Sequence, residues 1–586
     1  MDRAWGRVRG GAVAAVAVLL AGVVGSAPAT SSAAITSAAI TVDVSDHLGP
    51  INRDLVGIHG RASAASIGSD YGELRPTTHR HVMSAYDFMS FDCTTKTIAA
   101  SSLDYFNDWL DAVAAQGAEA ILSLSYVPPC YAKDGQPKGP VVDVAGYRAY
   151  LDQLFASLVT QRAADGKVPL RRFELWNEPD IPIDPGNPSA GHGYVGTLDE
   201  YVATNLPSLV GALLQAQADS GVHVQVGTPA SFAPWSFSFY APDLASLLHV
   251  TNGFSTKDAA AIAAQADAAF GPGATDRIMH NGGFTWPRRV IDEAEKLGLD
   301  IDFVSVHLYP NNPLQGVTFP EPDHPELLKG RNPLASPEDF ARLSARWSAE
   351  FPDQELIVSE WGLSAGNEQR NGTCETAAFD AASLSVMQEG TVDRALFLGR
   401  PGGVEDAPFR AWGDLPAEQV AADVPSSLDG VWATAASDAS RTTLLVSQWH
   451  SLLDDAKDLS VPIVVKGLAD GDYTVTVDWI GEGRALTPGT KEVDVTSTGG
   501  ELTLPVPVPL RGQSLARIDI RPTGTAALRP FTRAESTAPA GTCLPDPRSN
   551  PTTTTTTTAV TSTTTPGTES VPPAAQPVDG APTYTG

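Results

Sequence analysis

The first 425 residues alternate between short apolar runs and longer segments with apolar residues at helical spacing. Residues 119–127 form an apolar run that ends at Pro128, and residues 102–116 before it have the spacing of one helical face. Such alternation predicts strands connected by helices. We expect eight strands, at residues 54–60, 72–82, 119–127, 171–176, 222–228, 301–308, 355–361 and 393–399. The pattern at 72–82 is ambiguous, and the rhythm of the later units is the reason for placing a strand there.

The strands are apolar along most of their length, which is typical of a parallel sheet covered by helices. Eight such units predict an α/β fold, a (β/α)8 TIM barrel, over residues 45–425. An open doubly wound sheet is the alternative, but no glycine-rich phosphate turn follows the first strand. Residues 229–286 form an insertion after the fifth strand, at the expected barrel mouth. Trp235 and Trp286 in it would either stack on sugar rings or pack against the barrel.

The pattern changes after residue 425. Residues 426–525 contain short alternating runs separated by Gly and Asp turns, which predicts an antiparallel β-sandwich. The strand at 36–44 alternates in the same way, and we expect it to join this domain. Residues 526–586 are rich in Thr and Pro and cannot bury a core, so we expect a disordered tail, either a spacer or a segment without a role.

Residues 1–34 have the features of a signal peptide. A start that contains Arg3, Arg7 and Arg9 precedes an apolar stretch at 11–25 and small residues at the cleavage position. A membrane anchor is the alternative, but the stretch is shorter than the ~20 residues that span a bilayer. We therefore expect a secreted, extracellular protein without stable membrane insertion after signal cleavage, and association with the cell wall stays open.

Four cysteines in a secreted chain predict disulfides. Cys93 and Cys130 follow early strands, so a bond between them would join neighbouring loops, and Cys374 with Cys543 would then tie the end of the chain to the barrel. Four separate thiols are the alternative.

The net charge of −29 argues against nucleic-acid binding, because a phosphate binder needs a basic face. No CxxC pair and no His/Cys cluster with metal-ligand spacing occurs, so we expect neither metal nor cofactor. The sequence leaves the oligomeric state open.

Two glutamates end strands that face the same rim of the predicted barrel. Glu178 ends the fourth strand in Trp176-Asn177-Glu178-Pro179, and Glu360 ends the seventh. Two carboxylates facing each other across a pocket are what glycoside hydrolysis requires. A chance acid at a strand end is the alternative for Glu178 taken alone.

This arrangement resembles the clan A glycoside hydrolases. Matches at residues 196–201, 226–230 and 303–310 make the chain most similar to glycoside hydrolase family 39, the β-xylosidase and α-L-iduronidase family. The resemblance covers about residues 40–525. It implies a barrel followed by a β-sandwich, with Glu178 as acid/base and Glu360 as nucleophile.

The resemblance also implies substrate-binding residues. Asn177 would bind the sugar 2-hydroxyl. His307 and Tyr309 alternate on the sixth strand and would both face the mouth, where Tyr309 would hydrogen-bond Glu360; a buried structural histidine is the alternative for His307. Trp361 would either form the pocket floor or pack in the core.

The chain departs from the family at two positions. Strand eight ends in Arg400 where a Trp is common, and this arginine would bind a substrate carboxylate or phosphate or form a structural ion pair. On strand two, Arg75, His79, Arg80 and His81 are all candidates for the active site.

The sequence thus predicts a secreted retaining glycosidase that acts on an oligo- or polysaccharide. Its sugar, its linkage and the choice of exo or endo action stay open. The alternatives are a non-catalytic carbohydrate-binding or cell-wall protein on a degenerate barrel, and an endo-acting exopolysaccharide hydrolase of the same clan.

Overall fold

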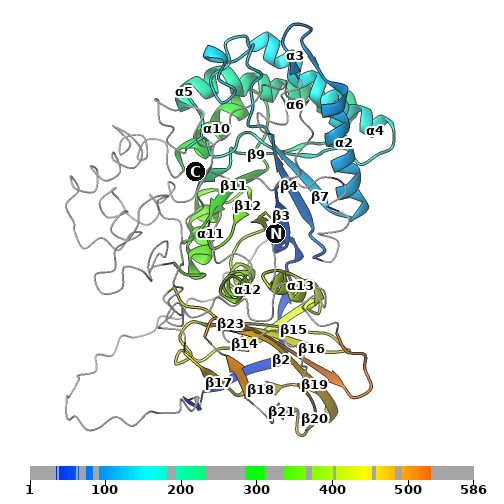
Figure 1. The fold of residues 1–586 in the computed structure, drawn as a ribbon, viewed down its shortest axis with the longest axis vertical. Coiled ribbons are helices and arrows are strands. Elements are labelled where there is room, and N and C mark those ends of the chain that lie inside the picture. Colours follow the sequence, from blue (N-terminus) through cyan, green and yellow to red (C-terminus); the bar gives the residue numbers. More distant parts are fainter. Residues whose placement is uncertain are drawn as a thin grey trace, which may run out of the picture.

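Eight parallel strands close into a barrel in the computed structural model (Figure 1). The described residues are 34–35, 38–60, 64, 67, 74–83, 91–180, 193–232, 284–310, 335–364, 373–399, 404–451, 457–481, 491–505, 507–510 and 512–528. In barrel order the strands are β3 (Gly57–His59), β4 (Thr78–Val82), β7 (Glu119–Ser123), β8 (Arg172–Glu174), β9 (Gln225–Gly227), β11 (Phe303–Leu308), β12 (Glu355–Trp361) and β13 (Arg394–Leu398). Pairing of β13 with β3 and of β9 with β11 closes the ring, so the predicted TIM barrel is confirmed.

Helices cover the outside of this barrel. The principal ones are α2 (Ala100–Ala115), α3 (Val144–Phe155), α6 (Leu206–Ser220), α10 (Thr285–Lys296), α11 (Glu338–Glu350), α12 (Cys374–Glu389) and α13 (Asp406–Asp414). Local signals set their ends: the Asp143 side chain caps α3, and Gly221 ends α6 with a φ of 67°, which suits glycine.

Side chains fill the interior of the barrel. Ile121, Phe303, Ile357 and Leu396, from β7, β11, β12 and β13, form a cluster of their own. The Phe303 ring requires Gly227 opposite, because a Cβ added there would lie 1.9 Å from Cε2 of Phe303. The barrel is therefore a packed core, and its chemistry is confined to its mouth.

A second, mostly antiparallel β-domain follows the barrel. Its large sheet has the order β20 (Lys491–Ser497), β19 (Gly471–Gly481), β23 (Ser514–Pro522), β16 (Thr442–Gln448), β15 (Val431–Ser437), β14 (Glu418–Asp423), β2 (Ile40–Pro50), β18 (Ile463–Lys466) and β21 (Glu501–Thr503). A small sheet contains β1 (Ala34–Ile35), β17 (Leu459–Val461) and β22 (Val508–Leu510). The architecture agrees with the predicted barrel followed by a β-sandwich.

The sheet order places the chain start in this β-domain. β2 pairs with β14 and β18, as expected for the strand at 36–44. The predicted barrel limits at 45 and 425 need correction, because β2 continues to Pro50 and β14 begins at Glu418, both within the β-domain sheet. Alternation continues across both limits, and sequence composition alone did not mark them.

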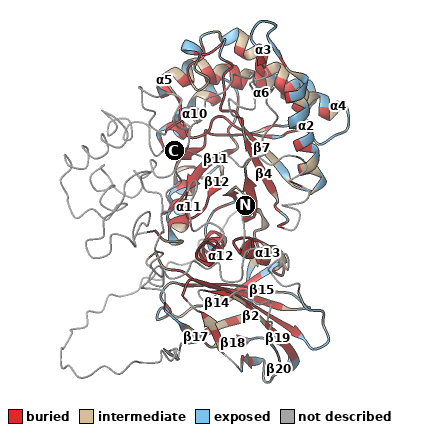
Figure 2. Cartoon of the chain, viewed as in Figure 1, coloured by how far each residue is buried: buried red, intermediate tan, exposed pale blue. Residues whose placement is uncertain are grey.

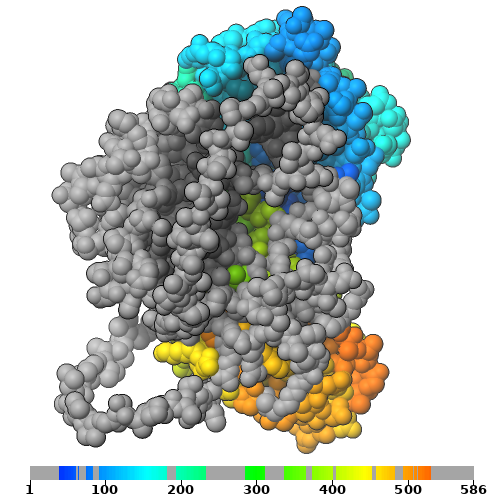
Figure 3. Space-filling view, in the orientation of Figure 1, coloured from blue at the N-terminus to red at the C-terminus, as the bar shows by residue number. Residues whose placement is uncertain are grey.

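Helix α12 lies between the barrel and the β-domain. Of its 16 residues, 14 are buried, and Figure 2 shows α12 and α13 as largely buried elements above the sheet. The Phe379 ring of α12 meets Trp449 edge to face, with centroids 5.2 Å apart. In the space-filling view, the early barrel residues (blue to cyan) and the β-domain (yellow to orange) lie at opposite ends of the molecule (Figure 3).

The predicted disulfide between Cys93 and Cys130 is present and joins the segments that follow β4 and β7. Cys374 is also in a disulfide, while Cys543, its predicted partner, lies outside the described residues. The signal peptide and the tail beyond 528 lie outside them as well. Among the described helices, none has the length and apolar character needed to cross a membrane.

Candidate active site

Glu178 lies just beyond β8, on a backbone held by the neighbouring segment. Its N–H donates to the carbonyl of Ala230 over 2.8 Å, and Asn177 forms a parallel bridge with the same residue. The φ of Glu178 is 48°, in the left-handed region that non-glycine residues rarely adopt. Such backbone conformations persist only where the surrounding structure holds them, and they are found most often at functional sites.

Glu360, near the end of β12, is surrounded by donors from β3, β4 and the residue that follows β11. Tyr309 donates its hydroxyl to Oε2 over 2.7 Å, and Arg80 donates Nη1–H to Oε1 over 2.7 Å. His59 Nε2 lies 3.2 Å from the same Oε1. Both oxygens are thus satisfied, and the carboxylate is held in one orientation.

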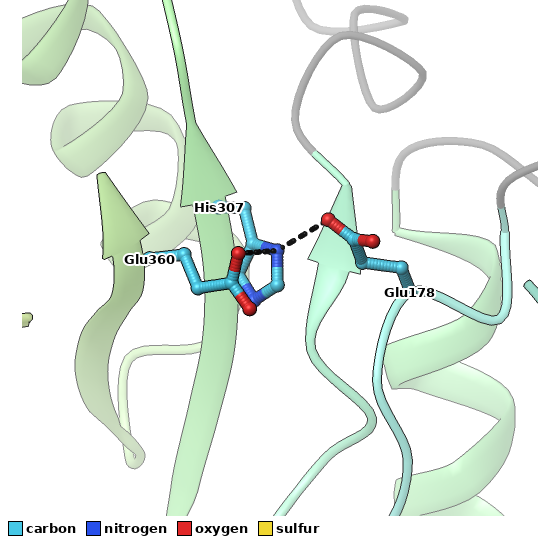
Figure 4. Close-up of side chains that lie close together, drawn as sticks. All are labelled: Glu178, His307 and Glu360. Atoms are coloured by element: carbon cyan, nitrogen blue, oxygen red, sulfur yellow. Dashed lines mark hydrogen bonds and ion pairs between the residues drawn. The ribbon is translucent and has the colours of Figure 1, made fainter. Parts of the chain in front are cut away.

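His307 lies between the two glutamates (Figure 4). Its Nδ1 is 2.7 Å from Oε1 of Glu178 and 3.5 Å from Oε2 of Glu360, and its ring is fully buried. One atom from each of the three side chains lies within 4.8 Å of the others. An oxygen of Glu178 and an oxygen of Glu360 are therefore separated by no more than 4.8 Å.

Arg80 connects Glu360 to a second buried carboxylate. Its Nε–H donates to Glu174 Oε2 over 2.7 Å, and its Nη2–H donates to Asn177 Oδ1 over 2.7 Å. Ser305 donates its hydroxyl to the other oxygen of Glu174. Because Arg80 occupies the amide oxygen of Asn177, the amide NH2 group is the end left for a ligand.

The electrostatics of the site favour an ionised Glu360. Burial by itself raises the pKa of this carboxyl, but the electrostatic interactions with His307, His59 and Arg80 and the Tyr309 hydrogen bond lower the pKa by more, so the net shift is downward. Burial lowers the pKa of His59 to about 3, which leaves Arg80 as the permanent cation of the group. Burial, and then the negative charge of Glu360, raises the pKa of Tyr309 well above its usual value and keeps its hydroxyl a donor.

Three donor atoms so close together also have the spacing of metal ligands. Both oxygens of Glu360 already accept hydrogen bonds, however, and the Arg80 guanidinium supplies positive charge to that carboxylate. Protein donors therefore meet the needs of Glu360 without an ion.

The structure brings Glu178, Glu360, Asn177, His307 and Tyr309 together, as the sequence predicted. Trp361 is elsewhere: its ring is fully buried and meets Phe340, Phe397 and Phe409. Of the two roles considered for Trp361, packing in the core is correct, and its assignment to substrate binding is wrong. Successive side chains of a strand point to opposite faces, so a neighbour of Glu360 faces the surrounding helices. Arg400 lies outside the described residues.

Among the candidates on strand two, Arg80 is the one that reaches Glu360. His79 contacts Gln116 of the segment after α2, and His81 lies among the rings of Tyr105, Phe106 and Trp109. Arg75 is largely exposed and binds Asp414. The alternation of β4 explains this division, since Arg80 points to the opposite face from His79 and His81.

Three contributors were not predicted from the sequence. His59 ends β3, and Glu174 ends β8, where an acid between the apolar Phe173 and Leu175 is a signal that could have identified it. The third is Lys138: burial lowers its pKa, and the nearby charge of Glu178 partly offsets this effect. Trp286 packs against Tyr194 and Tyr201 instead of lining the mouth, and Trp235 lies outside the described residues.

Comparison with known proteins places this architecture among sugar-cleaving enzymes of solved structure. A family 39 glycoside hydrolase from Xanthomonas axonopodis pv. citri superposes with a TM-score of 0.57 at 16% identity, covering 83% of this chain and 98% of that one. A glucosidase from Croceicoccus marinus gives 0.55 at 15% identity, covering 83% and 99%. The chain has the fold of these glycoside hydrolases.

A third similar structure is CelM2, a bifunctional glucanase-xylanase from a metagenome library, with a TM-score of 0.52 at 16% identity and coverage of 83% and 99%. No family model matches the sequence, and no curated protein matches it with significance. At these identities the comparison establishes the fold, and the site residues must carry the argument for function.

Proposed function

We propose that this protein is a secreted, retaining glycoside hydrolase. The observation that carries the proposal is the pair Glu178 and Glu360, with oxygens no more than 4.8 Å apart at one barrel mouth. Retaining enzymes hold their carboxyl groups about 5–5.5 Å apart, whereas inverting enzymes leave room for a water between them, at about 6.5–9.5 Å. The short separation therefore supports retention.

The surroundings of each carboxyl suggest its role. Glu360, bound by Arg80 and Tyr309 and favoured as the anion, suits the nucleophile that attacks the anomeric carbon. Glu178, whose carboxyl contacts the imidazole of His307, suits the acid that protonates the departing oxygen. For the first step of this reaction, Glu178 must hold a proton while Glu360 is ionised.

The reaction would then proceed in two displacements. In the first, the bond from the anomeric carbon to the glycosidic oxygen breaks, the oxygen takes the proton of Glu178, and Glu360 forms an ester with the sugar. In the second, Glu178 takes a proton from water, the water oxygen bonds to the anomeric carbon, and the ester bond to Glu360 breaks. The amide NH2 group of Asn177, oriented by Arg80, would bind the 2-hydroxyl in both steps.

The activities named for the similar structures, a glucosidase and a glucanase-xylanase, make glucosides and xylosides the first substrates to test. We expect the purified protein to hydrolyse an aryl glycoside of one of these sugars, with retention of anomeric configuration as followed by proton NMR. Glu360→Ala should abolish turnover. Added azide should not restore hydrolysis, because azide that takes the place of the missing carboxylate leaves in the product as a glycosyl azide. Binding of sugars without any turnover by the intact protein would favour the non-catalytic alternative.

A further inference from the structure

A cavity of about 580 Å³ lies where the barrel helices meet the β-domain. It is lined from α11 and α12 on one side and from β14, β15 and the segment that follows β16 on the other. We term it the junction groove; its principal polar and aromatic lining residues are Glu338, Glu389, Asp429, Trp432, Trp449 and His450. None of the described residues that contact Glu178 or Glu360 lines it, so the groove is separate from the candidate active site.

Two indole rings in the groove are held in place. The half-buried Trp432 donates its Nε1–H to Oε1 of Glu338 over 2.9 Å, which links β15 to α11. Trp449 is 2% exposed and packs on Phe379, yet its Nε1 has no hydrogen-bond partner among the described residues. Buried donors are normally satisfied, so the indole of this lining residue has a hydrogen bond still to offer.

The charge of the groove restricts the ligand. Glu338, Glu389 and Asp429 are acidic, and the described lining contains no lysine or arginine. Burial, and then the charge of Glu338, raises the pKa of Glu389, so this part of the groove already disfavours negative charge. Ligands that carry carboxylate or phosphate groups are therefore excluded.

We propose that the junction groove is a second saccharide-binding site, for a neutral sugar chain. An indole that is fixed in orientation offers an apolar face for the C–H face of a pyranose, while carboxylates accept hydrogen bonds from its hydroxyls. A ligand hydroxyl oxygen would also satisfy the N–H of Trp449. A site that combines aromatic walls with a few convergent polar groups is the usual form of a small-molecule pocket.

Affinity electrophoresis of the full-length protein in native gels tests this proposal directly. The gels contain neutral xylan, neutral β-glucan or, as an anionic probe, polygalacturonate, and every protein carries Glu360→Gln so that the polymer stays intact. We expect a neutral polysaccharide to retard migration and polygalacturonate to have no such effect. Trp432→Ala, which removes a stacking face, and Glu389→Gln, which replaces a charged acceptor, should each weaken the retardation about tenfold.

Glu501→Gln, an exposed acid on β21 that does not line the groove, is the matched control for Glu389→Gln and should bind as the parent does. Glu389→Gln is the second groove variant because Trp432→Ala could loosen the fold, whereas Glu389→Gln keeps the size of a side chain at the C-terminal end of α12. Equal retardation of the parent and both groove variants would assign binding to the barrel mouth and overturn the proposal. The proposal would also be overturned if neither neutral polymer retarded the protein. The proposed function is tested separately, by hydrolysis of an aryl glycoside with the protein that keeps Glu360.

Discussion

Arg80 and Glu360 form a buried ion pair, with Arg80 Nη1 2.7 Å from Glu360 Oε1. The same guanidinium also lies 2.6 Å from Glu174 Oε2, so one cation neutralises two buried carboxylates. Burial by itself lowers the pKa of Arg80, but the negative charges of Glu174 and Glu360 raise the pKa by more, so the arginine stays charged. Two functions thus depend on one side chain: the ionisation of Glu360 and the stability of the barrel interior.

Replacing Arg80 should therefore change both stability and the pH profile. Arg80→Met leaves two buried carboxylates without their cation, and breaking a buried pair in this way costs about 3–5 kcal/mol in the free energy of unfolding. The pKa of Glu360 should rise once this charge is gone, which moves the acidic limb of kcat/KM to higher pH. Urea unfolding and a pH profile of kcat/KM measure the two effects.

Arg75→Met is the matched control, because Arg75 also pairs with an acid, Asp414, but its side chain is 59% exposed. Exposed pairs contribute about 0–1 kcal/mol, so stability should change little and the pH profile not at all. If Arg80→Met keeps the wild-type acidic limb, Arg80 does not set the ionisation of Glu360.

Tyr309→Phe should reduce catalysis without removing the fold. The variant loses the hydroxyl that donates to Glu360 Oε2 over 2.7 Å, a hydrogen bond to a charged acceptor worth about 1.5–3 kcal/mol. We expect kcat/KM to fall about 10- to 100-fold and its acidic limb to move upward, since that hydrogen bond lowers the pKa of Glu360. Tyr147→Phe, which removes a buried hydroxyl that donates to Tyr126 O over 3.1 Å, should affect stability and leave kcat/KM unchanged. Equal kcat/KM for Tyr309→Phe and wild type would show that the Tyr309 hydroxyl does not contribute to catalysis.

The loss of activity in Glu178→Ala should depend on the leaving group. General acid catalysis contributes about 10²–10⁴-fold, and a substrate whose leaving group departs without protonation does not need it. We expect a large fall in the glycosylation rate for an alkyl glycoside and a much smaller one for a dinitrophenyl glycoside, measured in a single turnover. Azide should then accelerate the second step and yield a glycosyl azide of unchanged anomeric configuration. An equal loss with both leaving groups would argue against the acid role of Glu178.

The sequence was sufficient to predict the barrel and the two glutamates because both follow from strand periodicity. Strands such as Phe303–Leu308 are nearly continuous apolar runs, and Glu178 and Glu360 lie close to the ends of two strands. The assignment of Arg80 needed more, since it depends on which residues of the short strand Thr78–Val82 face inward, and the alternation has meaning only once the strand is placed. The same uncertainty of face left Trp361 with two roles, although its neighbour Glu360 was correctly placed.

The contacts of His59 and Glu174 could not be predicted from the sequence, because they join strands far apart in the chain. Arg80 contacts Glu174, 94 residues later, and Glu360, 280 residues later. Such contacts depend on the register of neighbouring strands around the closed barrel, which local pattern does not specify.

Stability should fall as the pH drops below about 6.5, in part because of His79. Burial lowers the pKa of His79 to about 4 from a usual 6.5, and its hydrogen bond with Gln116 offsets only part of this shift. Between these two values the unfolded chain binds a proton that the folded chain does not, so acid favours unfolding. The contribution is complete above 6.5, is lost progressively as the pH falls to about 4, and amounts to as much as about 1.4 kcal/mol per pH unit. His59, with a pKa of about 3, acts in the same direction.

Urea unfolding at pH 7, 6 and 5 should show this dependence of stability on pH. His79→Gln should reduce the dependence, whereas His223→Gln, at an exposed side chain, should retain it. If His79→Gln and wild type lose the same free energy of unfolding from pH 7 to pH 5, the buried His79 does not take part in the acid response.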